Sequence, residues 1–133
     1  MTDTVNHPPH YTVHPIFRIE CHDLARMLTF DAGSAVKYLW RAGRKGGISE
    51  DLRKALWYLE RIESPYRASQ LWDESVRLAI VEDLNRWSYD HAGDAPILEA
   101  ASSAIERIAA GDLRSAQILA HEALDHVNEG VTA

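Results

Sequence analysis

The sequence contains a single cysteine, Cys21, so no disulfide can form within the chain. The lack of cross-links suits a reducing compartment. Long apolar runs are also missing: no stretch approaches the roughly 18 apolar residues of a membrane span. The first fifteen residues lack the apolar segment of a secretory signal. We therefore expect a cytoplasmic protein with no membrane partner.

Signals for β-strands are absent, because no segment alternates apolar and polar residues and no hairpin turn appears. Apolar residues make up 46% of the 133 residues, which is enough to form a core. Three of the five prolines fall within residues 1–15 and predict an extended arm. The expected fold is all-α: a compact bundle of about five or six helices with an extended N-terminal arm. Apolar spacing predicts helices over residues 19–28, 32–42, 50–63, 71–87, 96–110 and 113–127.

Several residues predict where these helices begin and end. Ser49 is a good N-cap for the third helix, and Pro96 suits the first turn of a later one. Gly111 followed by Asp112 predicts a short turn between the last two helices, which we expect to form an antiparallel hairpin. Residues 89–95 are predicted to form a loop. Trp40 and Trp57 are expected in the core.

Basic residues are scarce in the second half of the chain. Residues 1–72 hold 10 Lys/Arg and 8 Asp/Glu, whereas residues 73–133 hold 4 and 12. An overall charge of −6 argues against general nucleic-acid binding, which depends on broad neutralisation of phosphates. The basic excess is local, because Lys37, Arg41, Arg44 and Lys45 occur close together with no acidic residue among them. A patch of this size suits one small anionic ligand.

No Walker A loop is present, so a phosphate site must be built differently. Lys37 and Arg41 are four residues apart and share a helix face. Arg44 and Lys45 precede the glycine pair Gly46-Gly47, whose backbone can approach a ligand closely, and the next helix begins with free amides. These features predict a phosphate cradle. The alternative is that the cations only complement the C-terminus of their helix.

Carboxylate, histidine and aromatic sets offer further candidates. Glu20 and Asp23 lie three residues apart and could hold Mg²⁺, although such pairs are also common on solvated helix faces. The histidines of the N-terminal arm match no zinc pattern. Tyr38 and Tyr58 flank the basic segment, face away from the apolar stripes and could stack on a base.

Four sequence blocks occur in order: HPPHY at residues 7–11, IECHD at 19–23, GSAVKYLWRAGRK at 33–45 and EDLRKALWYL at 50–59. Together they resemble the SaV-like family of bacteriophage proteins, over roughly residues 6–62. One branch of that family is described as phage nucleotide kinases that act on deoxynucleoside phosphates. Ser34 departs from the family pattern, which usually has asparagine there.

The resemblance implies a nucleotide-binding region over residues 1–66, followed by an acidic helical region over residues 67–133. That second region belongs either to the same compact domain or to a helical appendage. Glu20 and Asp23 stand at motif positions of that family, where they would hold Mg²⁺ as a cofactor or orient a sugar hydroxyl. The expected nucleotide-binding residues are His10, Tyr11, Lys37, Tyr38, Arg41, Arg44, Lys45 and Lys54.

Three functions stay open at this point. The first is a phage-encoded nucleotide-binding protein of the infected host cytoplasm that acts as an enzyme, either a deoxynucleotide kinase without a P-loop or an Mg²⁺-dependent nucleotide hydrolase. The second is a protein that sequesters a nucleotide without converting it. The third is an interaction module that targets a host protein. We expect a homo-oligomer, with the acidic, alanine-rich terminal helices as the contact surface.

Overall fold

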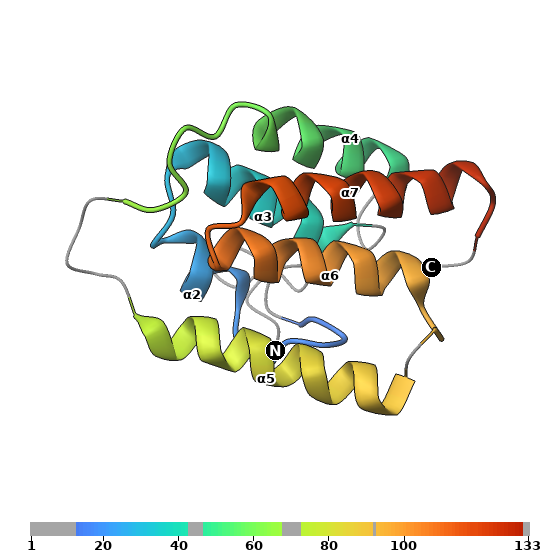
Figure 1. The fold of residues 1–133 in the computed structure, drawn as a ribbon, viewed down its shortest axis with the longest axis horizontal. Helices are drawn as coiled ribbons and strands as arrows, with labels where there is room; N and C mark the ends of the chain where they lie inside the picture. The colour runs from blue at the N-terminus through green and yellow to red at the C-terminus, as the bar shows by residue number, and fades with distance from the viewer. Residues whose placement is uncertain (1–12, 43–46, 68–72, 92, 132–133) are drawn as a thin grey trace, which may run out of the picture.

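The computed structural model describes residues 13–42, 47–67, 73–91 and 93–131. Six helices lie within these residues and follow one another along the chain (Figure 1). They are α2 (Cys21–Ala25), α3 (Phe30–Arg41), α4 (Ile48–Leu59), α5 (Glu74–His91), α6 (Pro96–Ala109) and α7 (Leu113–Asn128). The only strand-like pairing in the described part of the chain is an isolated bridge between Leu28 and Tyr66. The predicted all-α class is confirmed.

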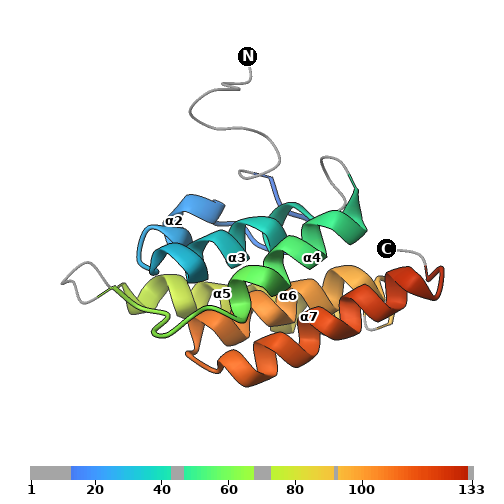
Figure 2. The same ribbon diagram turned by 90° about the horizontal axis from the view of Figure 1, so that it is seen from above.

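The helices form two layers of three. α2, α3 and α4 lie side by side in one layer, and α5, α6 and α7 lie side by side in the other (Figure 2). Each helix of the first layer packs on its counterpart in the second: α2 on α5, α3 on α6 and α4 on α7. None of the helices in the described ranges has the length and apolar character needed to cross a membrane.

One continuous hydrophobic core joins the two layers. Val36, Leu39 and Trp40 of α3 and Leu52 of α4 are almost fully buried in it. α6 and α7 contribute mainly alanines, such as Ala104 and Ala120, whose small side chains let neighbouring helices approach closely. The described residues of both halves of the sequence therefore share a single core.

The segment before α2 covers one end of this core. Ile16 and Phe17 are buried, and the Phe17 ring lies 5.1 Å from the ring of Trp40. The backbone amides of Ile16 and Phe17 donate to Nδ1 of His14 at 3.0 and 3.2 Å. The buried imidazole therefore accepts hydrogen bonds from two amides that lie outside any helix. His14 thus has a structural role in the fold.

Several helix bounds differ from the predicted ones, and α2 covers only Cys21–Ala25 of the predicted range 19–28. α4 begins at Ile48 with Gly47 as its N-cap, so the prediction of Ser49 in that role is wrong. α4 ends at Leu59, four residues before the predicted end. α5 continues to His91 through part of the predicted loop, because the chain turns only at Gly93, whose φ is +81°.

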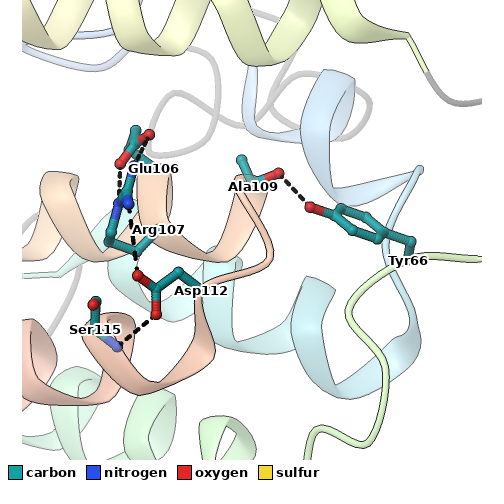
Figure 3. A network of polar contacts seen from close by, with 6 residues as sticks. All are labelled: Tyr66, Glu106, Arg107, Ala109, Asp112 and Ser115. Atoms are coloured by element: carbon teal, nitrogen blue, oxygen red, sulfur yellow. Dashed lines mark hydrogen bonds and ion pairs between the residues drawn. The ribbon is translucent and has the colours of Figure 1, made fainter.

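The turn between α6 and α7 confirms the predicted antiparallel hairpin (Figure 1). Asp112 caps α7 by accepting a hydrogen bond of 3.1 Å from the amide of Ser115. Arg107 joins Glu106 to Asp112 across the turn, and the hydroxyl of Tyr66 donates to the carbonyl of Ala109 at 2.8 Å (Figure 3). Side chains of the turn and its two helices, together with Tyr66 from the segment after α4, therefore hold this turn in place.

Candidate functional site

Two tyrosines meet at the outer seam between α3 and α4. α3 and α4 pack on each other, and both helices bury apolar residues such as Leu39 and Leu52 in the shared core. The rings of Tyr38 and Tyr58 stack with centroids 5.9 Å apart and planes 14° from parallel. Both side chains are half-buried, so part of each ring remains open to solvent. The sequence prediction that these two tyrosines lie off the core stripes agrees with this position.

Cations from both helices flank the Tyr38 ring. The guanidinium carbon of Arg41 lies 5.1 Å from its centroid, and Nζ of Lys54 lies 5.5 Å away. These distances allow the ring quadrupole to attract both charges. We name Tyr38, Tyr58, Arg41 and Lys54 the seam cluster. The structure therefore brings together three of the predicted nucleotide-binding residues, Tyr38, Arg41 and Lys54.

Lys54 is held in place by Glu50 one helical turn earlier, with Nζ 3.0 Å from the carboxylate. The hydrogen bond from Lys54 lowers the pKa of the Glu50 carboxyl, and the same bond raises the pKa of the Lys54 ammonium. Both groups are exposed to solvent, so the pair contributes little to the stability of the fold. Its consequence for a ligand is that the Lys54 charge is already partly neutralised.

Arg41 is engaged by a buried carboxylate. Its Nε and Nη2 donate to the same oxygen, Oδ1 of Asp51, at 3.2 and 3.1 Å. Asp51 is only 2% exposed, and no donor among the described residues reaches its other oxygen, Oδ2. A buried carboxylate needs its partner cation. Arg41 therefore stabilises the fold through Asp51, a role that the sequence prediction of Arg41 as a nucleotide-binding residue did not include.

Lys37 lies on the other side of α3, towards α2. Burial raises the pKa of the Cys21 thiol to about 12, and the positive charge of Lys37 opposes this increase. The Lys37 side chain is exposed. It thus belongs to the α2–α3 side of this layer, whereas the seam cluster occupies the α3–α4 side.

Glu20 and Asp23 also lie on the α2 side. The backbone amide of Glu20 donates to Oδ2 of Asp23 at 2.9 Å, so the Asp23 carboxylate caps the start of α2. Within the described residues, no group of three or more histidine, cysteine or acidic side chains comes together as a metal site would require. Mg²⁺ binding by this pair stays a prediction.

Four of the predicted binding residues, His10, Tyr11, Arg44 and Lys45, lie outside the described residues. The seam cluster is thus the part of the predicted site that the structure lets us describe.

The seam also carries aromatic residues that the sequence analysis did not assign to a site. Trp57 is 51% exposed rather than in the core, so that prediction is wrong. The guanidinium carbon of Arg61 lies 3.6 Å from the Trp57 ring centroid, and Phe30 at the start of α3 is 79% exposed. The spacing of Trp57 and Arg61, one helical turn apart, was the available signal for an exposed cation–π pair.

The fold and the seam cluster define an all-α protein whose outer helix pair presents aromatic rings between cations. The family described as "Protein of unknown function (DUF3310)" matches residues 5–60, the part of the chain that includes α2, α3 and α4. That description assigns no activity. Comparison with curated proteins gives no match, and neither does comparison with solved structures.

Proposed function

We propose that the seam cluster binds a nucleotide, with the base against the tyrosines and the phosphate near the cations. The observation that supports this most is the Tyr38 ring, which stacks on Tyr58 and has Arg41 and Lys54 within 5.5 Å of its centroid. A base can stack on an aromatic ring whatever its sequence context, and this contributes about 1–3 kcal/mol per base. A phosphate can accept hydrogen bonds from the neighbouring cations.

In this proposal the three cations have different roles. Lys54 is the direct phosphate contact, because its side chain is exposed and the carboxylate that holds it, Glu50, is exposed as well. Arg41 orients Tyr38 and adds positive charge while it remains paired with Asp51. Lys37 supplies a further charge from the α2 side of α3, where a second phosphate could extend.

Calorimetric titration with a panel of deoxynucleoside monophosphates tests the binding. Lys54→Ala should weaken it about tenfold, which corresponds to 1.4 kcal/mol. Arg53→Ala is the matched control, since it removes a neighbouring exposed cation from the same helix and should leave the affinity unchanged. Absence of binding at millimolar nucleotide, or equal losses in both variants, would contradict the proposal.

Binding alone leaves two outcomes for the ligand. In a deoxynucleotide kinase, the γ-phosphoryl group of ATP passes to a phosphate oxygen of the monophosphate, giving ADP and a deoxynucleoside diphosphate. In a sequestering protein, the nucleotide leaves unchanged. Incubation with ATP, Mg²⁺ and each monophosphate separates the two: turnover that Lys37→Ala abolishes identifies the kinase. Unchanged nucleotide recovered from a saturated protein identifies sequestration. Phosphoryl transfer depends mainly on positioning and charge stabilisation, so the missing P-loop does not exclude the kinase.

The setting proposed for this activity is the cytoplasm of a phage-infected bacterium, on the strength of the four sequence blocks. Self-association stays part of the proposal and is measured by sedimentation at several protein concentrations.

A deletion of the terminal helices is not a suitable test for an interaction surface. α6 and α7 supply much of the shared core, so deleting residues 94–133 would unfold the protein rather than remove a docking surface.

A further inference from the structure

A second pairing of an aromatic ring with a cation lies at the end of α4, between Trp57 of the helix and Arg61 just after it. The guanidinium of Arg61 covers the Trp57 ring at 3.6 Å and also donates from Nη1 to the Trp57 carbonyl at 2.6 Å. Arg61 lies two residues beyond the end of α4 and seven residues after Lys54, so roughly 10 Å separates the two along the helix axis. The cations of the two pairings are therefore far enough apart to face different parts of one extended ligand.

The aromatic residues between these pairings form a continuous row. Tyr58 stacks on Tyr38 and also meets Phe30 in an edge-to-face arrangement with centroids 6.0 Å apart. Trp57 meets Tyr58 at 5.0 Å in an edge-to-face arrangement. Phe30 is 79% exposed, which leaves most of its apolar surface in water. A ring that ends an aromatic row and remains exposed is suited to stack on a ligand.

A hollow of about 400 Å³ opens beside Phe30, between the start of α3 and the segment after α4. A volume of this size is within the range of small-molecule sites. Phe30 and Arg61 line it, together with the acidic residues Asp31 and Glu63. The two carboxylates disfavour a phosphate inside the hollow, but they can accept hydrogen bonds from the amino group of a base.

We infer that this hollow holds a second base, so that the ligand of the seam has two bases joined through phosphate. The first base lies at Tyr38, the second lies between Phe30 and Arg61, and the bridging phosphate lies between Lys54 and Arg61. The bases carry amino groups, as adenine and cytosine do, because carboxylates face the hollow. This inference rests on the proposed nucleotide binding and specifies the class of nucleotide. Either a phosphodiester or a pyrophosphate bridge would join the two bases through phosphate in this way.

The test compares one-base and two-base ligands by calorimetry. The ligands are dAMP, the phosphodiester-linked dinucleotide d(ApA) and the pyrophosphate-linked diadenosine diphosphate. At least one two-base ligand should bind about tenfold more tightly than dAMP, and the linkage that does so identifies the bridge. Phe30→Ala should remove this gain and leave the affinity for dAMP unchanged. Tyr89→Ala removes a ring from α5 that is even more exposed than Phe30 and should change neither affinity.

The possible failures are distinguishable. If dAMP binds and neither two-base ligand binds more tightly, the second base site is wrong and the proposed nucleotide binding stands. The same conclusion follows if the gain survives in Phe30→Ala. If dAMP itself does not bind, the proposed function fails together with the inference. Because Phe30 is mostly exposed, its replacement should leave the protein folded, and circular dichroism verifies this.

Discussion

Arg41 and Asp51 form an ion pair across the seam of α3 and α4, in which two guanidinium nitrogens share one carboxylate oxygen. The Asp51 side chain is 3% exposed and that of Arg41 is 20% exposed. The pair thus connects the core between the two helices with the open surface that carries Tyr38. Disturbing it should affect both the stability of the helix pair and the geometry of the proposed site.

The first prediction concerns this pair. Arg41→Met leaves the Asp51 carboxylate buried without its cation, which should lower the free energy of unfolding by about 3 kcal/mol. The double variant Arg41→Met/Asp51→Leu should be more stable than the single variant, because it removes the uncompensated charge. Urea denaturation followed by circular dichroism measures both, with Arg53→Met as a control at an exposed cation. A double variant less stable than Arg41→Met would contradict a buried pair.

Glu50 offers a way to strengthen ligand binding. The hydrogen bond from Lys54 keeps the pKa of Glu50 below its ordinary value, so at neutral pH its carboxylate competes with a phosphate for Lys54. Glu50→Gln should therefore increase nucleotide affinity several-fold at low salt. The difference from the wild type should close only when the pH falls below the ordinary value of 4.5, where Glu50 itself becomes protonated.

Calorimetry of the two proteins across this pH range measures the effect. Glu82→Gln is the control, since it changes the net charge equally at an exposed position on α5. Equal gains from both variants would mean that only overall charge matters and that Lys54 is not the contact.

Gly111 should tolerate no side chain. Its φ of +80° strains any other residue, and a Cβ there would lie 2.9 Å from the Tyr66 hydroxyl. Gly111→Ala should therefore cost more than Gly93→Ala, which has nearly the same φ but nothing within 4 Å of the new atom. The backbone strain alone is about 1–2 kcal/mol. Thermal unfolding compares the two variants, and equal losses would show that the contact with Tyr66 is unimportant.

Cys21 should be unreactive in the folded protein. Burial raises the pKa of its thiol to about 12, so hardly any thiolate forms at pH 8. Iodoacetamide should label the protein rapidly only in urea. Because the folded pKa exceeds the ordinary value of 9.0, stability should fall as the pH rises between these two values. Cys21→Ser serves as the control that shows no such thiol-dependent decrease. Rapid labelling of the native protein at pH 8 would contradict the buried position.

The fold could be predicted from the sequence to the extent that helices depend on local pattern. Apolar spacing identified all six described helices, and Gly111 with Asp112 identified the final hairpin. Local pattern did not distinguish Ser49 from Gly47 as the N-cap of α4, because both residues can take that position. It also put Trp57 in the core, since a large aromatic ring near an apolar stripe is usually buried.

The candidate site was predicted only in part. Tyr38, Arg41 and Lys54 were all named from the sequence, and the structure brings them to one seam. The partner of Arg41 was not foreseen. Asp51 had a satisfactory local explanation in the first turn of its helix, where the helix dipole favours a carboxylate. Nothing in the sequence specifies that the two side chains meet across ten residues of chain.

The sequence by itself determined the helices, the turns of the final hairpin and the segregation of charge, because these follow from periodicity, backbone preferences and composition within a few residues. Only the tertiary structure decided which faces of α3 and α4 stay open, how Asp51 engages Arg41 and where Phe30 ends a row of aromatic rings. Those features depend on which layer covers which helix face, and that choice is made by packing between residues far apart in the chain.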